Sequence, residues 1–297
     1  MKRIYTIAAA ALLMACACSC SKEVLSSNSV IQTSETEKNE FDQWLEATYR
    51  NPYNIEFKYR YEFKESDVNY YTIPADMDCA IIMAHLVQHL CIETYNEVAG
   101  VNFTRKYFPK MFFCIGEWEY KNNGSFILGT AEGGKKIMLS GVNYLPQYMG
   151  TAEDLNHYYI KTIHHEFTHI LNQTEVYSTD FKQITANGYV ADSCFDEPYN
   201  STYLSRGFIT AYAQTDDGED FAEMMSEYIT HDDAWWRKQL KDAGDTAADA
   251  IGAKLEIVRN YMQDTFDIDI DVLRSTILRR QNEVMDGKVD LNDITLK

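Results

Sequence analysis

The sequence lacks an excess of basic side chains. Its 297 residues carry 27 lysines and arginines against 45 aspartates and glutamates, which gives a formal net charge of −18. Nucleic acids are bound through a basic surface, so this charge balance argues against a nucleic-acid partner. It argues equally against binding to anionic lipid through a polybasic segment. The negative charge itself is explained by solubility. The chain also lacks an internal repeat, and its length suits one large domain.

Cysteine pairs of the kind that build thiolate zinc sites are missing too. Four of the seven cysteines follow the N-terminal leader: Cys79, Cys91, Cys114 and Cys194. None of them forms a Cys-x-x-Cys pair, which argues against a cysteine-ligated zinc. Cys79 and Cys91 are twelve residues apart on one predicted helix, too far to form a disulfide. We therefore expect cysteines that are mostly free and buried.

Residues 1–20 predict a lipoprotein signal peptide. Lys2 and Arg3 form a positive start, and the apolar run Ile4–Met14 is too short to span a bilayer comfortably. Residues 21–40, rich in Ser, Thr and Glu, predict a flexible tether to a folded domain over residues 41–297.

The leader ends in a cluster of cysteines. Leu13-Met14-Ala15-Cys16 resembles a bacterial lipobox, in which Cys16 becomes the lipidated first residue of the mature chain. Cys18 and Cys20 each follow a small residue and remain alternatives. An ordinary secretory signal is the other interpretation. Lipidation would attach the protein to a membrane surface without a spanning helix.

The strongest functional signal is His165-Glu166-Phe167-Thr168-His169, a His-Glu-x-x-His pattern. On a helix, His165 and His169 are one turn apart on the same face and can bind one zinc ion. Glu166 lies beside them, where it can reach a water molecule at the metal. Helical spacing of apolar side chains predicts that residues 152–173 form this helix: Ile160, Ile163, Phe167, Ile170 and Leu171.

A catalytic zinc needs a third protein ligand and an open position. Metzincins place a glycine and a third histidine after the second histidine, but here Asn172 and Glu175 fill those places. Glu175 is one candidate, because a carboxylate can bind zinc.

The better candidates lie in a predicted helix, residues 219–230. Glu219 and Glu223 are four residues apart, away from its apolar stripe. One of them can bind zinc while the other orients a ligand histidine. Asp220 is the alternative in this segment. The helix dipole favours an acidic first turn, which explains Glu219 and Asp220 but explains Glu223 less well.

The sequence offers two further groups for the site. The phenol of Tyr212 could donate a hydrogen bond to an oxyanion near zinc, although a core tyrosine is the competing interpretation among 21 tyrosines. His85 and His89 are also four residues apart, on a predicted helix over residues 76–98, but no carboxylate lies between them. Packing or surface exposure explains this pair better than a metal does.

The remaining pattern predicts an α+β fold. We expect a small mixed sheet against the helix that carries the motif, followed by a mainly helical C-terminal part. Further helices are expected at 41–49, 233–265 and 270–285, an irregular segment at 174–205, and strands at 53–61, 111–120, 126–130 and 136–140. The last two strands form a hairpin that either pairs with a substrate backbone or only covers the helix.

The histidine motif and the acidic segment that begins at Glu219 together resemble a known family. His-Glu-x-x-His, followed at a distance by Glu-Asp-Phe-Ala-Glu with a tyrosine seven residues before the first Glu, resembles the lethal-factor-like gluzincins. This resemblance implies that Glu219 is the third zinc ligand, that Tyr212 assists catalysis and that Glu223 is the acid behind a ligand histidine.

The leader, the tyrosine-rich domain and both motifs also resemble the zinc-binding metallopeptidase lipoproteins associated with TonB-dependent substrate import. The resemblance covers most of residues 40–290. It implies a zincin-like fold, one zinc ion, a peptide or protein substrate, and an outer-membrane lipoprotein of a Gram-negative bacterium. Such a protein would face the periplasm or the cell surface and could join an import complex.

The sequence thus predicts a zinc-dependent peptidase. His165, His169 and Glu219 would hold zinc, Glu166 would move a proton, and Tyr212 would share the oxyanion with the metal. The alternative is a non-catalytic, substrate-binding lipoprotein with a structural zinc, and hydrolysis of a non-peptide amide is a third option. Glu166 and Tyr212 favour chemistry, because a structural zinc needs neither.

Overall fold

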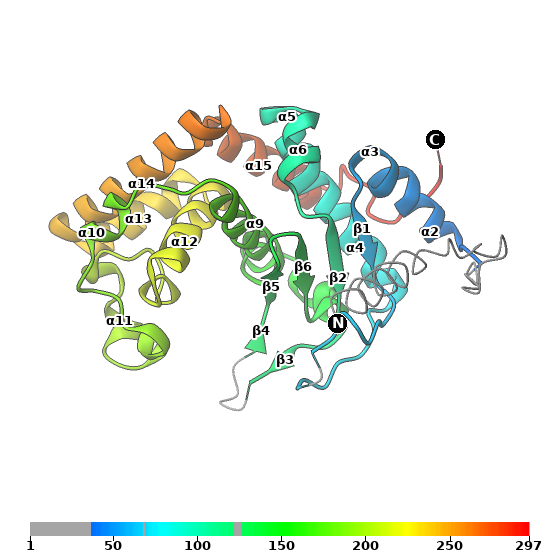
Figure 1. The fold of residues 1–297 in the computed structure, drawn as a ribbon, viewed down its shortest axis with the longest axis horizontal. Coiled ribbons are helices and arrows are strands. Elements are labelled where there is room, and N and C mark those ends of the chain that lie inside the picture. Colours follow the sequence, from blue (N-terminus) through cyan, green and yellow to red (C-terminus); the bar gives the residue numbers. More distant parts are fainter. Residues whose placement is uncertain (1–36, 68, 122–125, 297) are drawn as a thin grey trace, which may run out of the picture. The chain divides into compact units, whose positions relative to one another are not determined.

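The computed structural model describes residues 37–67, 69–121 and 126–296, and Asn39–Lys297 forms one compact unit (Figure 1). The predicted signal peptide, Cys16 and most of the predicted tether lie outside the described residues. Within the part of the chain that is described, no helix combines the length and apolar character needed to cross a membrane.

A group of helices begins the compact unit. Its helices are α2 (Glu40–Leu45), α3 (Asn51–Tyr53), α4 (Met77–Leu86), α5 (Glu93–Ala99) and α6 (Val101–Tyr107). π-helical stretches join α2 to α3 and α4 to α5, so the helices predicted at 41–49 and 76–98 are confirmed. Asn39 caps α2 by accepting a hydrogen bond from the Asp42 backbone at 2.8 Å, and the Asp42 side chain accepts one in return from the Asn39 backbone.

The main sheet has four strands in the order β1-β2-β6-β5. These are β1 (Glu56–Lys58), β2 (Met111–Cys114), β6 (Lys136–Leu139) and β5 (Gly129–Glu132). β2 runs parallel to both β1 and β6, and β5 runs antiparallel to β6 at the edge of the sheet. The hairpin predicted from Gly133-Gly134 is confirmed, and both glycines have the positive φ that such a turn favours.

Two strand predictions were too long. Only Glu56–Lys58 of the predicted strand 53–61 joins the sheet, because Tyr59 and Arg60 turn toward Asp42 of α2. The predicted strand 111–120 is split into β2 and a short β3 (Glu119–Tyr120), which pairs with β4 (Phe126–Ile127). The chain bends between β2 and β3 at Gly116, where an added Cβ would lie 2.3 Å from the Pro74 carbonyl oxygen.

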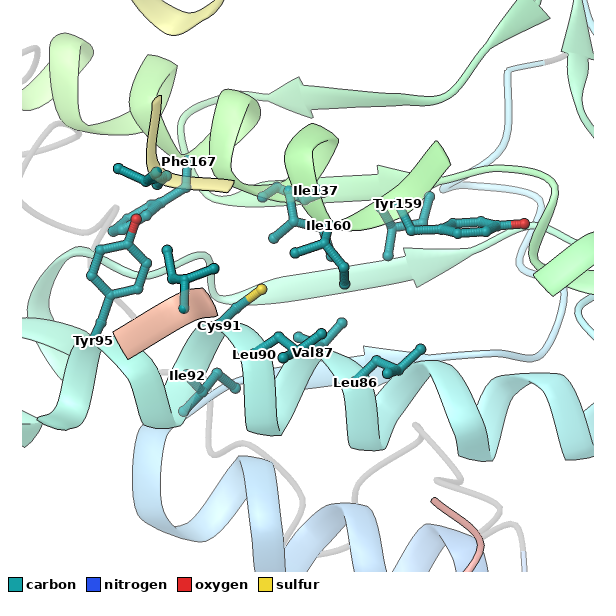
Figure 2. Close-up of a cluster of buried hydrophobic side chains, with 14 of the residues drawn as sticks. Leu86, Val87, Leu90, Cys91, Ile92, Tyr95, Ile137, Tyr159, Ile160 and Phe167 are labelled. Carbon is teal, nitrogen blue, oxygen red and sulfur yellow. The ribbon is translucent and has the colours of Figure 1, made fainter. Parts of the chain in front are cut away.

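The motif lies on one long helical run across the sheet. A short α7 (Leu145–Tyr148) leads into α8 (Ala152–Leu155), a π-helical stretch and α9 (Lys161–Thr174), which together match the predicted helix 152–173 closely. Figure 1 shows α9 alongside β5 and β6. Figure 2 shows apolar side chains of this run packed together with those of β6 and of the helical run from α4 to α5. The labelled residues are Leu86, Val87, Leu90, Cys91, Ile92, Tyr95, Ile137, Tyr159, Ile160 and Phe167.

The C-terminal half is helical. After α10 (Asp180–Ile184) and α11 (Tyr199–Thr202) come α12 (Asp217–Thr230), α13 (Asp233–Ala243), α14 (Asp245–Phe266) and α15 (Ile270–Met285). The segment predicted as irregular, 174–205, therefore contains short helices. The single helix predicted at 233–265 was wrong, because Gly244 adopts φ 79° and divides it. The prediction of α15 was right.

The α+β class, with a small mixed sheet and mostly helical content, is confirmed. The four cysteines after the leader are free and buried, as expected. His85 packs against Trp44 with ring centroids 4.4 Å apart and the rings tilted by 45°, and His89 Nε2 lies 3.1 Å from Glu283 Oε2. Packing and a contact with a carboxylate therefore explain this histidine pair.

Candidate metal centre

Two helices present rows of charged side chains to each other. His157, Lys161, His165 and His169 follow one another at four-residue spacing along the run that ends in α9, and Glu219, Glu223 and Glu227 do so on α12. Four-residue spacing places each row on one helix face. α12 packs directly against α9, so the rows meet, and all seven side chains line a cleft of about 700 Å³.

Three ligand atoms converge within this cleft. His165 Nε2 lies 2.9 Å from Glu219 Oε2 and 3.1 Å from His169 Nε2, and His169 Nε2 lies 3.2 Å from Glu219 Oε2. In a tetrahedral zinc site with metal–ligand distances of about 2.0–2.1 Å, neighbouring ligand atoms are separated by roughly 3.3 Å. The three observed separations are close to that value, and the imidazole and carboxylate donors are of the types that zinc binds, so these residues fit the ion.

The N-terminus of α12 is fixed by its own cap. Asp216 Oδ1 accepts hydrogen bonds from the backbone N–H of Gly218 at 2.8 Å and of Glu219 at 3.0 Å. This N-cap satisfies donors that the helix leaves open. The Glu219 carboxylate is thereby held at a defined position opposite the two histidines.

The electrostatics of the cluster favour a bound cation. Burial opposes a charge on His165, but its contacts with Glu219 and Glu223 outweigh this and raise the pKa of His165 to about 9. Burial acts against ionisation of Glu219, yet the hydrogen bonds from His165 and His169 hold its pKa well below the ordinary value. Carboxylates that raise the pKa of a buried imidazole would also attract a metal ion to the same place.

Glu223 contacts His165 on the side of the ring that faces away from the ligand cluster. Its Oε1 lies 2.7 Å from His165 Nδ1, the nitrogen on the far side of the ring from the ligand cluster. Lys161 Nζ donates to Oε1 and Oε2 at 2.8 and 3.1 Å, and Thr210 Oγ1 donates to Oε2 at 2.7 Å. Glu223 is thus placed to orient the His165 ring.

Glu166 faces the cleft from α9 and lies outside the ligand cluster. Ala131 of β5 lines the same cleft, and its backbone acts to lower the pKa of Glu166. Burial raises the pKa of Glu166, the charges of His165 and His169 act in the opposite direction, and the net shift is upward. A carboxylate with a raised pKa beside a ligand cluster is suited to accept and return a proton.

Tyr212 lies at the mouth of the cleft. Its side chain is 37% exposed, its ring centroid is 6.0 Å from that of His165, and Phe195 stacks on it at 6.1 Å. Burial and the nearby charge of Glu219 raise the pKa of Tyr212, so the phenol keeps its proton. The structure therefore does not place Tyr212 in the hydrophobic core.

Two other candidate ligands lie elsewhere. Asp220 is completely buried on another face of α12, where Lys254 Nζ is 2.6 Å away and the Tyr189 hydroxyl donates to it at 3.0 Å. Glu175 is exposed at the end of α9 and does not line the cleft. Among the described residues, the groups that come together as a possible metal site are His165, His169 and Glu219.

Sequence reasoning missed Lys161, Thr210 and Glu227. Helical spacing could have identified two of them, since Lys161 is one turn before His165 and Glu227 is one turn after Glu223. Thr210 carried no local signal, because its contact with Glu223 depends on how the loop before α12 folds back.

The edge strand β5 forms one wall of the cleft through Gly129, Thr130 and Ala131. The hairpin therefore lies along the cleft and does more than cover the helix. An edge strand has backbone groups free to pair with an added strand.

Comparisons with known proteins find one family and one solved structure that are similar to this chain. Residues 34–271 match the family described as "Putative zinc-binding metallo-peptidase". A crystal structure described as a putative zinc-binding metallo-peptidase from Bacteroides caccae is similar, with 38% identity and a TM-score of 0.74, over 90% of this chain and 100% of that chain. No curated protein matches.

Proposed function

The chain belongs to this zinc-binding metallo-peptidase family, and from that premise we propose that it is a zinc-dependent peptidase with a zincin-like fold of the gluzincin type. The observation that carries the proposal is the convergence of His165 Nε2, His169 Nε2 and Glu219 Oε2 within 3.2 Å of one another. Glu166 lies in the same cleft, and a purely structural metal site would not need it.

Each residue has a separate task in peptide hydrolysis. His165, His169 and Glu219 would hold one zinc ion, which when bound supplies Lewis-acid polarisation of a carbonyl and a lower pKa for water. Glu166 accepts a proton from the attacking water and passes it to the leaving amine. The Tyr212 hydroxyl donates a hydrogen bond to the developing oxyanion. The free edge of β5 offers backbone groups for pairing with an extended substrate.

Hydrolysis of a broad peptide library tests the proposal directly. We expect cleavage by the zinc-loaded protein, loss of cleavage after chelation, and recovery when zinc is restored. The alternative, a substrate-binding lipoprotein with a structural zinc, predicts no cleavage by protein that elemental analysis shows to be fully loaded.

Replacing Tyr212 by phenylalanine should lower kcat by about 100-fold, the usual cost of removing one oxyanion donor. Zinc content should stay unchanged, because Tyr212 is not part of the ligand cluster. Steady-state kinetics and elemental analysis measure the two effects. Tyr71→Phe, at a site that is 85% exposed, is the matched control. An unchanged kcat in the Tyr212 variant would remove the phenol from the mechanism.

We further propose that the protein is an outer-membrane lipoprotein of a Gram-negative bacterium, lipidated at Cys16 and facing the periplasm or the cell surface. A TonB-dependent import complex is the proposed partner. The support is the leader sequence and the family resemblance described above. Cys16→Ala should abolish incorporation of a labelled fatty acid. If incorporation is lost only in Cys18→Ala or only in Cys20→Ala, that cysteine is the lipidated residue instead.

A further inference from the structure

Lys161 is a nearly buried cation placed between two carboxylates of α12. It is the first residue of α9, one helical turn before His165. Its Nζ lies 2.8 Å from Glu223 Oε1 and 3.4 Å from Glu227 Oε1. The side chains of Lys161, Glu223 and Glu227 are 17%, 2% and 10% exposed. Buried carboxylates at this depth are costly without a counter-charge, and Lys161 supplies it.

The contacts of Lys161 lead directly to a ligand of the proposed metal. Glu223 Oε1 receives a hydrogen bond from Lys161 and lies 2.7 Å from His165 Nδ1. Lys161 also reaches Glu223 Oε2, so it holds both oxygens of the carboxylate. The opposite ring nitrogen of His165, Nε2, faces Glu219 and His169. Lys161, Glu223 and His165 therefore form a continuous chain of contacts that ends at a ligand atom.

A histidine that binds a metal through Nε2 usually donates its Nδ1–H to an acceptor, which fixes the tautomer and the ring orientation. Glu223 Oε1, 2.7 Å from Nδ1, is the carboxylate oxygen placed for that role. Without Lys161, the buried Glu223 carboxylate would lose its lysine counter-charge, and only Thr210 and the imidazole would remain to hold it beside His165.

We propose that Lys161 is a positioning residue of the metal centre: it holds the Glu223 carboxylate and thereby orients His165 with Nε2 toward the ion. The inference rests on the proposed metal site and deepens it. Lys161 touches neither the ligand atoms nor the reacting groups.

Zinc affinity, measured by competition with a chromophoric chelator, tests this proposal. Lys161→Met keeps most of the apolar stem but removes the charge and the donors. We expect zinc binding 10- to 100-fold weaker, the usual effect of losing an outer hydrogen-bond partner. Glu223→Gln should also weaken binding. Lys161 and Glu223 act along one chain of contacts, so their effects should not add. The double variant should have the same zinc affinity as the single variant with the lower affinity.

Lys58 provides a matched control. It too is mostly buried, at 13% exposure, and lies between Glu62 and Glu65 at 2.8 and 3.3 Å, but it is on β1, at the opposite edge of the sheet from β5. Lys58→Met should leave zinc affinity unchanged. The absorption spectrum of the cobalt-loaded protein is a second readout, which should change in Lys161→Met and not in Lys58→Met.

Two results would overturn the inference: wild-type zinc affinity in folded Lys161→Met, or losses that multiply in the double variant. If Lys161→Met does not fold, Lys161→Gln, which keeps a donor but no charge, decides the question by the same measurement. All readouts are of metal binding. A protein that binds zinc and cleaves nothing would therefore refute the peptidase proposal while leaving the role of Lys161 open to the same test.

Discussion

Glu166→Gln is expected to lower kcat/KM for peptide hydrolysis by about 100- to 10,000-fold, the range attributed to general acid–base catalysis. Glutamine keeps the size and the polarity of the side chain, but it cannot take a proton from water. Zinc content should remain the same, because Glu166 is not part of the ligand cluster. Peptide cleavage rates and elemental analysis of the same preparation measure both quantities.

Glu153→Gln is the control for this experiment. It makes the same chemical change at an exposed position on α8, in the same helical run as the motif. Its activity should equal that of the wild type. Full activity in Glu166→Gln would contradict the mechanism, and loss of zinc together with activity would show that Glu166 acts on the metal site itself.

Glu219→Ala should lose zinc, and with it all metal-dependent activity. The variant keeps two imidazoles but no carboxylate at the cluster, so one of the three ligands is missing. Zinc-loaded wild type should also unfold at a higher temperature than the apo form, because a ligand that binds only the folded state stabilises it by about 2.7 kcal/mol at 100 times its Kd. This zinc-dependent shift should disappear in the variant.

Glu175→Ala separates Glu219 from the other acid that the sequence offered. Glu175 is exposed beyond the cleft, so this variant should retain zinc and the thermal shift. Full zinc occupancy in Glu219→Ala, measured by elemental analysis, would place the third ligand elsewhere. Loss of zinc in Glu175→Ala would point to the end of α9.

Local spacing determined a large part of this protein in advance. His165 and His169 share a face because they are four residues apart on a helix, and the apolar residues at helical spacing predicted that helix closely. The same reasoning predicted α15 and the turn at Gly133-Gly134. It predicted strands less well, because pairing in a sheet depends on partners distant in sequence, and Arg60 contacts Asp42 instead of continuing β1.

The choice among the acids was decided only by tertiary structure. Asp220 and Glu219 are neighbours in sequence, yet the packing of α12 turns Glu219 toward α9 and Asp220 toward Lys254 of α14. The role of Lys161 likewise needs Glu223, 62 residues away, to be brought against it. Helical periodicity fixes which side chains share a face of one helix, but the packing of distant helices decides which faces meet. The residues of the candidate metal centre come together where two such faces meet.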